Sequence, residues 1–290
     1  MKEENVNMDN GCNVYIQGDS LKILSLNLNN FGGLDIEQQT FNWNSEEKIL
    51  ERLKRAIDIW SYIIESNAHI VVLQEFDNGD VVGNKFSKML RISGFILIGE
   101  KITGSIVKIA IRENIYKRYY FNHKNKELKA YAKWTEIEVE LKNENNLKII
   151  GIHVPLADTE KRKQFKKELK KLKDTSNNTI VIGDFNAATN KDRAILKNEN
   201  DKTILENKKL LDLMSDYFID VWRHKNPNAK EYTWYFRNEK NGRRLDYAFV
   251  SRDLTNKYSC DVNYDHDVNL IINDKGITDH SAIILNLNDE

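Results

Sequence analysis

The stretch Thr179-Ile180-Val181-Ile182-Gly183-Asp184-Phe185-Asn186 is the strongest indicator of the fold. Its first four residues are β-branched, which predicts a buried strand. Because side chains alternate along an extended chain, Asp184 and Asn186 point to one side and Phe185 to the other. A charged residue that ends an apolar strand is usually a solvated loop residue. An acid and an amide that project together instead indicate metal or phosphate chemistry.

Similar apolar runs recur along the chain, with helical patterns between some of them. The runs are Leu21–Leu28, Ile70–Leu73, Phe95–Ile98, Ile106–Ile111, Trp134–Leu141, Leu147–Ile152, Thr179–Ile182, Arg244–Val250 and Ala282–Leu287. Ser45 predicts a helix N-cap, and the apolar residues that follow on one helical face are Ile49, Leu53, Ile57, Trp60 and Ile64. A second helix is predicted from Asp158 to Asp174, with Phe165, Leu169 and Leu172 inward, and a third over 202–214. Helices among many strands predict an α+β fold, with a loose leader over 1–20 and a single domain over 21–290.

Composition and charge limit the classes of function. The chain has 44 Lys and Arg residues against 44 Asp and Glu residues, so a nucleic-acid partner would have to be held by a local patch. The polar start and the absence of a long apolar window predict a cytoplasmic protein without a membrane partner. Cys12 and Cys260 lie far apart, which favours free thiols over a disulfide. No pattern predicts an oligomer, and a monomer is the default expectation.

Oxygen and imidazole ligands stand at the ends of several predicted strands. They are Asn27, Gln74 with Glu75, His153, Asp184 with Asn186, Asp246, and Asp279 with His280. Taken singly, each is most simply a turn former or a solvated residue, and Asp246 could pair with a neighbouring Arg. Taken together, crowded carboxylates repel one another unless a cation compensates. Oxygen ligands without Cys or paired His spacing predict Mg²⁺, with Mn²⁺ as a substitute, rather than Zn²⁺.

The same segments form an ordered set. They are Leu26-Asn27, Leu73-Gln74-Glu75, Ile152-His153-Val154-Pro155, Gly183-Asp184-Phe185-Asn186, Arg244-Leu245-Asp246-Tyr247 and Thr278-Asp279-His280-Ser281. In this order they resemble the endonuclease/exonuclease/phosphatase superfamily, the deoxyribonuclease I-like group, over nearly the whole chain. The resemblance implies a four-layer α/β-β/α sandwich, in which two packed mixed sheets are flanked by helices. It places the active site where strand ends of both sheets meet.

The resemblance also implies a role for each residue in phosphoester hydrolysis. Glu75 is expected to be the principal metal ligand, helped by Asn27 and Asp279. His280 is expected to activate water, oriented by Asp246.

The remaining positions are expected to bind phosphate or to support the site. Asp184 and Asn186 would hold the phosphate, and Asp184 would also position the nucleophile or protonate the leaving group. His153 would contact the scissile phosphate. The supporting positions are Gln74, Arg244 and Tyr247.

Two positions distinguish branches of the superfamily. Deoxyribonucleases and sphingomyelinases usually carry Asn where this chain has Gly151, and exonuclease III-like enzymes usually carry Tyr in place of His153. The segments 218–223 and 232–235, in contrast, resemble nuclease-type members. The branch therefore stays open.

Basic and aromatic residues offer candidates for substrate contacts. The Lys-rich predicted helix at 158–174 is first of all a solvated outer face, and a phosphate-tracking patch is the alternative. Trp222 and Trp234 could stack on bases, although core packing explains them equally well. The candidates in and beside the basic loop before Asp246 are Arg237, Lys240, Arg243 and Trp234.

We therefore predict a Mg²⁺-dependent phosphodiester hydrolase, foremost a nuclease that uses His-activated water and acts on DNA rather than RNA. Endonuclease and exonuclease activity both remain open. The alternative is a phosphatase or phosphodiesterase acting on a phospholipid, an inositol phosphate or a nucleotide. A non-catalytic binding module is disfavoured, because the acidic and histidine positions of the set are all intact.

Overall fold

The computed structural model describes residues 20–32, 45–77, 79–102, 104–122, 133–143, 145–156, 159–174, 177–193, 202–236 and 241–289. Residues 1–19 of the predicted leader lie outside these ranges, as do Cys12, Asp158, Arg237 and Lys240.

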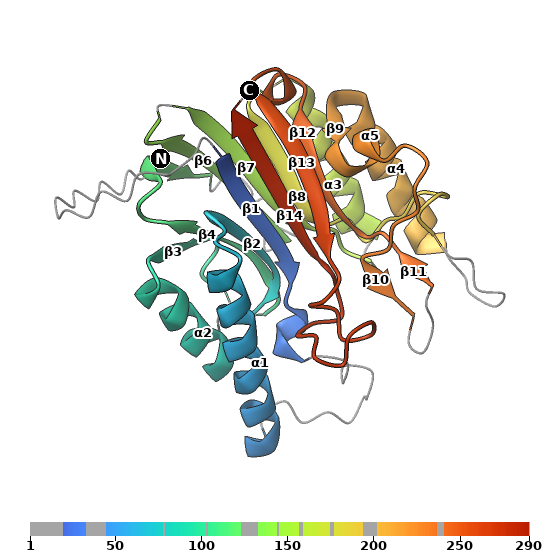
Figure 1. Ribbon diagram of the computed structural model, residues 1–290. Coiled ribbons are helices and arrows are strands. Elements are labelled where there is room, and N and C mark those ends of the chain that lie inside the picture. The colour runs from blue at the N-terminus through green and yellow to red at the C-terminus, as the bar shows by residue number, and fades with distance from the viewer. Residues whose placement is uncertain are drawn as a thin grey trace.

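Two six-stranded mixed sheets form the centre of the fold (Figure 1). The first has the order β13 (Tyr258–Asp265), β14 (Ala282–Asp289), β1 (Ser20–Asn27), β2 (Ile70–Phe76), β4 (Ile106–Arg112), β3 (Phe95–Ile98). The second has the order β5 (Tyr116–Phe121), β6 (Trp134–Leu141), β7 (Asn146–His153), β8 (Thr179–Asp184), β12 (Asp246–Ser251), β9 (Phe218–Asp220). The pairs β1–β2 and β7–β8 are parallel, and the other pairs in these sheets are antiparallel.

Helices cover the outer face of each sheet. Apolar residues of α1 (Glu46–Glu65) and α2 (Val81–Ile92) pack on the first sheet, and those of α3 (Thr159–Lys171) and α4 (Lys202–Tyr217) pack on the second. A third apolar cluster lies between the sheets and joins residues such as Val72 and Ile109 to Ile149 and Ile182. These layers confirm the predicted α/β-β/α sandwich.

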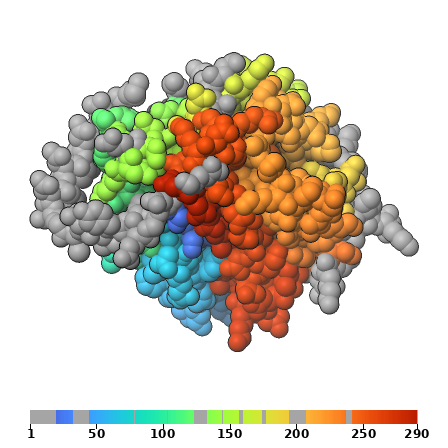
Figure 2. Space-filling model, turned by 45° about the horizontal axis from the view of Figure 1, so that its top comes forward, coloured from blue at the N-terminus to red at the C-terminus, as the bar shows by residue number. Residues whose placement is uncertain are grey.

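Shorter elements complete the described chain. They are the 3₁₀ helices η1 (Asn29–Phe31), η5 (Leu172–Asp174) and η6 (Leu254–Asn256), helix α5 (Val221–Lys225), and the hairpin of β10 (Trp234–Tyr235) and β11 (Gly242–Arg243). Segments from both ends of the described chain lie side by side, because β1 pairs with β14 and β2. Figure 2 shows blue and dark red atoms, from near the two ends of the described chain, side by side at the surface. Among the described residues, no helix combines the length and apolar character that crossing a membrane requires.

Every predicted strand overlaps an observed one, but the strand predicted from Arg244 begins at Asp246. The prediction was wrong at this end because the backbone amides of Arg244 and Leu245 do not form hydrogen bonds between strands. They donate to the Asp192 carbonyl (3.0 Å) and to Thr233 Oγ1 (2.9 Å). The prediction also omitted β5, β9, β10, β11, β13, α2 and α5.

Helix α1 begins as predicted, since Ser45 Oγ accepts a hydrogen bond from the Lys48 amide. The predicted inner face is wrong at Ile57, whose side chain is 51% exposed. The fully buried row is Arg52, Ala56, Ile59 and Ile63. Arg52 belongs to this row because its guanidinium bonds to the Asn30 carbonyl and the Asp80 carboxylate.

The two sheets approach each other closely at Gly151. A Cβ atom at this position would lie 2.6 Å from Val72 Cγ1 and 3.0 Å from Val107 Cγ1. An Asn side chain does not fit here, so the glycine follows from the packing of the two sheets.

Candidate active site

The carboxyl ends of the two parallel strand pairs bring the predicted residues together. Asn27 lies opposite Gln74 at the end of β1–β2, and His153 lies opposite Asp184 at the end of β7–β8. Asp246, the first residue of β12, also pairs with Asp184. Figure 1 shows the end of β1, the loop before β14 and the β10–β11 hairpin gathered at the lower end of the sheets.

Backbone irregularities set the direction of two of these side chains. Glu75 has φ 51° and lies where the pairing of β2 with β4 shifts register. Asn186, just beyond β8, has φ 46°. Positive φ is uncommon outside glycine, and such residues and bulges cluster at functional sites.

Side chains from both sheets meet around Asn27. Its Nδ2 donates to Glu75 Oε1 (3.3 Å) and to Asp184 Oδ2 (3.2 Å), while its Oδ1 accepts from the Asn29 amide (3.0 Å). In this orientation the amide nitrogen faces the acids, and a half-turn of the amide would present the oxygen to a cation. Asp279 lies beside this group, because Thr278 Oγ1 donates to the Asn27 carbonyl (2.7 Å) and to Asp279 Oδ1 (3.4 Å).

His280 and Asp246 form a hydrogen-bonded pair. His280 Nδ1 lies 2.9 Å from Asp246 Oδ2, which also accepts from Thr233 Oγ1 (2.6 Å). An ionised carboxylate only accepts, so Nδ1 carries a proton, and Nε2 accepts one when the imidazole is neutral. Burial lowers the pKa of His280, but Asp246 outweighs it by charge and hydrogen bond, and the pKa lies well above its usual value.

The site contains more acidic side chains than basic ones, and their surroundings shift their pKa values. Burial, and then the charge of Asp246, raise the pKa of Asp184 to about 8, and burial also raises the pKa of Asp279. Burial alone would raise the pKa of Glu75, but the charge of Lys133 and the hydrogen bond from Asn27 lower it.

His153 lies beside the two acids Glu75 and Asp184. Its Nε2 lies 3.5 Å from Glu75 Oε1 and 3.8 Å from Asp184 Oδ2. Burial, and then the charge of Lys133, lower the pKa of His153 to about 3. The imidazole is therefore neutral at physiological pH.

The donor set fits a divalent cation. The carboxylates are crowded and in excess, and Gln74 Oε1 is buried without a hydrogen-bond partner. Carboxylate and amide oxygens are the ligands of hard cations. One group that could hold an ion is Asp184, Asp246 and His280, whose ligand atoms lie within 4.8 Å of one another. Because Asp246 Oδ2 is already engaged by His280 and Thr233, the end of the site near Glu75 is better suited to the ion.

A buried ion-pair network holds the chain that leads to Asp246. Arg244 Nε lies 2.9 Å from Asp192 Oδ2, and its Nη2 lies 2.6 Å from Asp220 Oδ2. The guanidinium stacks over Tyr247, 4.3 Å from the ring centroid, and the Tyr247 hydroxyl donates to the Arg244 carbonyl (2.9 Å). These contacts hold the segment before Asp246 in place, and the supporting role of Arg244 and Tyr247 in the site stays a prediction.

Sequence patterns assigned no role to several residues of the site, although Asp220 and Thr233 lie in the segments 218–223 and 232–235 that resemble nuclease-type members. The residues without an assigned role are Lys133, Ser105, Thr233, Asp192, Asp220, Asn207 and Tyr264, which contact the predicted residues directly or through one neighbour. Each reaches the site from a different element. No spacing in the sequence connects them.

The predicted substrate-contact residues have different surroundings. Trp234 is partly exposed and its backbone bridges to His280, which places it at the rim of the site. Arg243 is buried, with its guanidinium 4.9 Å from the Phe236 ring centroid. Trp222 is buried in the core, so its core-packing interpretation is the correct one.

Helix α3 confirms the predicted inward residues, since Phe165, Leu169 and Leu172 are buried. Its lysines lie on the exposed and half-exposed faces.

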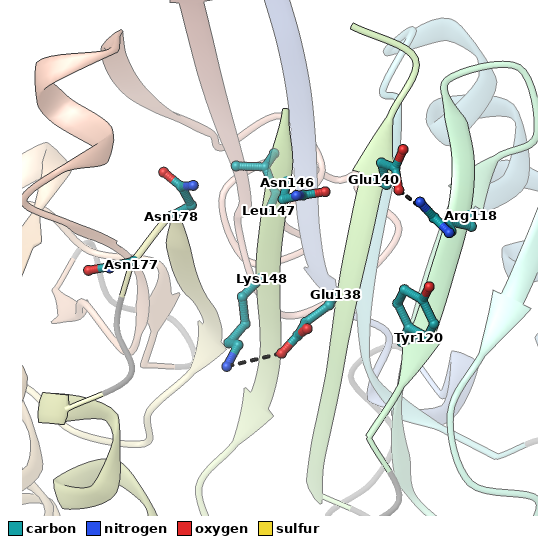
Figure 3. Close-up of a pocket in the computed structure, with 9 residues that line it drawn as sticks. All are labelled: Arg118, Tyr120, Glu138, Glu140, Asn146, Leu147, Lys148, Asn177 and Asn178. Carbon is teal, nitrogen blue, oxygen red and sulfur yellow. Dashed lines mark hydrogen bonds and ion pairs between the residues drawn. The ribbon is translucent and has the colours of Figure 1, made fainter. Parts of the chain in front are cut away.

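A polar hollow of about 420 Å³ lies at the other end of β7 and β8 (Figure 3). Asn146, Asn177 and Asn178 line it together with the cross-strand ion pairs Arg118–Glu140 and Lys148–Glu138. Such pairs are typical of a solvated sheet face. Because these charges neutralise one another and the hollow is far along the strands from His280, we do not regard it as the substrate site.

Comparison with known proteins identifies the family. The model of the Endonuclease/Exonuclease/phosphatase family matches residues 24–280. The chain belongs to this family. Members of the endonuclease/exonuclease/phosphatase family hydrolyse phosphoester bonds, and its nucleases use divalent metals. A sequence search against curated proteins gave no significant match.

Solved structures share the fold at low sequence identity. NExo, a 3′ phosphatase from Neisseria bound to a product DNA hairpin, is 16% identical, with a TM-score of 0.63 over 93% of this chain and 99% of that chain. An AP endonuclease from Archaeoglobus fulgidus is 20% identical, with a TM-score of 0.63 over 91% and 98%. The AP endonuclease LMAP from Leishmania major is 12% identical, with a TM-score of 0.69 over 94% and 89%. At these identities the likeness extends to the fold alone.

Proposed function

We propose that this chain is a Mg²⁺-dependent nuclease that cleaves phosphodiester bonds of DNA with water activated by His280. One observation carries the proposal. His280, oriented by Asp246, lies at the junction of the two sheets with the partly buried acid Glu75 and the buried acid Asp184. This combination provides a general base, a carboxylate that can carry a proton, and acidic side chains that could bind a cation.

His280 and Asp184 divide the proton transfers. Asp246 holds the Nδ1 proton of His280, so Nε2 accepts a proton from water, and the water oxygen forms a bond to phosphorus. The bond between phosphorus and the leaving oxygen breaks, and Asp184 gives its proton to that oxygen. The step requires a neutral His280, whereas the surrounding acids raise its pKa and favour the protonated imidazole. The positive charge of a bound cation would offset these acids and favour the neutral form. The step also requires a protonated Asp184, whose pKa burial and Asp246 raise to about 8.

Asn186 and His153 bind the phosphate. The Asn186 side-chain amide donates one hydrogen to the Val154 carbonyl (2.9 Å) and keeps a second for a phosphate oxygen. Asp184 Oδ1 accepts from the Asn186 amide (2.7 Å), which ties the two residues together. Glu75 and Asp279, with Asn27, would hold the cation. A bound divalent cation supplies positive charge that neutralises phosphate oxygens and offsets the surrounding carboxylates.

DNA is the favoured substrate class because NExo, which shares the fold, was solved with a DNA product. The second candidate is a phosphatase, favoured because the same NExo protein is a 3′ phosphatase. Both reactions would use the same general base and the same cation-binding residues. They differ in whether the phosphate bears one ester bond or two.

Binding of Mn²⁺ and cleavage of a labelled DNA duplex, measured on the same variants, test the proposal. Glu75→Gln should lose both Mn²⁺ binding and cleavage. His280→Ala should still bind Mn²⁺ but lose about 10²- to 10⁴-fold in cleavage rate, the usual range for a general base. His224→Ala, an exposed histidine of α5, is the matched control and should change neither. Loss of Mn²⁺ binding in His280→Ala and Asp246→Asn, but not in Glu75→Gln, would contradict the assignment of the ligands.

A further inference from the structure

A partly buried lysine contacts His153, the histidine proposed to bind phosphate, from the side away from the acids. Lys133 stands just before β6, and its Nζ lies 3.1 Å from His153 Nδ1 and 2.7 Å from Ser105 Oγ. The opposite edge of the imidazole ring presents Nε2 to Glu75 and Asp184. The ring is thus held between an ammonium group and the acidic end of the site.

These contacts determine which nitrogen of His153 carries the proton. An ammonium group donates hydrogen bonds and cannot accept one. Nδ1 therefore accepts from Lys133, and the ring proton of the neutral imidazole resides on Nε2. Ser105 Oγ accepts a second ammonium hydrogen, which fixes where the lysine head lies.

From this geometry we infer that Lys133 is a positioning residue that holds His153 as the Nε2–H tautomer, so that His153 donates a hydrogen bond to a phosphate oxygen of the substrate. The part concerning substrate rests on the proposed function. The part concerning the tautomer rests only on the contacts of Lys133, Ser105 and His153.

The two histidines of the site thereby acquire opposite properties from opposite partners. The Asp246 carboxylate places the proton of His280 on Nδ1 and leaves Nε2 as an acceptor. The Lys133 ammonium places the proton of His153 on Nε2 and makes it a donor. One imidazole is prepared to take a proton from water and the other to bind a phosphate oxygen.

Nitrogen NMR of ¹⁵N-histidine-labelled protein tests the tautomer directly, because protonated and unprotonated ring nitrogens have well-separated shifts. The His153 signals are assigned by their disappearance in His153→Gln. The wild type and Lys133→Arg should show a protonated Nε2. Lys133→Met, which keeps the length but cannot donate, should show a population protonated at Nδ1. Lys163→Met, an exposed lysine of α3, is the matched control and should leave the signals unchanged.

Cleavage kinetics test the consequence for the substrate. Lys133→Met should lose roughly 10- to 100-fold in kcat/KM, the effect of one misdirected hydrogen bond to a charged group, and Lys133→Arg should recover most of it. A wild-type spectrum with the His153 proton on Nδ1 would overturn the inference without any variant. An unchanged tautomer in folded Lys133→Met would do the same. Because the spectra need no substrate, they decide the inference even if the protein proves inactive on DNA.

Discussion

Replacing Arg244 with methionine should destabilise the protein by about 3–5 kcal/mol, the usual cost of breaking a buried ion pair from one side. Arg244 is fully buried between Asp192, whose side chain is 0% exposed, and Asp220, whose side chain is 13% exposed. Asp192 keeps a second partner in Arg223. In Arg244→Met the carboxylate left without a cation is therefore mainly that of Asp220, because both of its oxygens accept hydrogen bonds from Arg244.

Thermal and urea unfolding followed by circular dichroism measure this cost. At about 2–4 °C per kcal/mol, the expected fall in Tm is roughly 6–20 °C. The double variant Arg244→Met, Asp220→Asn removes the uncompensated charge and should recover a large part of the loss, because Asn can still cap α5. Lys225→Met, on the same helix, breaks a pair whose side chains are 44% and 38% exposed and should cost less than about 1 kcal/mol. An Arg244→Met effect no larger than that of Lys225→Met would refute the reasoning.

Two further predictions concern the packing between the sheets and a buried lysine. Gly151→Asn should lower the free energy of unfolding by about 1–3 kcal/mol, because even its Cβ would approach Val72 Cγ1 to 2.6 Å, and urea unfolding that matches the wild type would contradict this. Burial lowers the pKa of Lys108 from 10.5 to about 8, so between these values the unfolded chain binds more protons than the folded one. The stability of the wild type relative to Lys108→Met should therefore rise from about pH 8 to about pH 10.5, and a pH-independent difference would show the shift to be absent.

The sequence predicted the strands and their polar ends because these depend on local patterns. The runs ending at Asn27 and Asp184 could be found from their apolar residues alone, which are mostly leucine in the first and β-branched in the second. Strand β13 was missed although its alternation is regular: Tyr258, Cys260 and Val262 are buried, and the polar residues between them face outward. It contains no continuous apolar run, which is the pattern by which the other strands were predicted. Helix α2 left a usable signal, since Asp80 caps it and Val82, Phe86 and Leu90 recur at helical spacing.

The residues that support the site could not be predicted from the sequence, because tertiary contacts determine which residues they bind. Lys133 reaches His153 from the residue just before β6, the strand next to β7, and Thr233 reaches Asp246 from the residue just before β10. Similarly, Ile57 fits the helical pattern of α1 but is exposed, because Arg52 occupies the inner row through bonds to another loop. Periodicity predicts a face of a helix, whereas the partners across the fold decide which residues it buries.

Nicking of supercoiled plasmid DNA by the purified protein is the most direct test of a cation-dependent hydrolase centred on His280. We expect nicking with Mg²⁺, none with EDTA, and a rate about 10²- to 10⁴-fold lower for His280→Ala at saturating Mg²⁺. Nicking that survives EDTA, or that His280→Ala performs at the wild-type rate, would contradict the account.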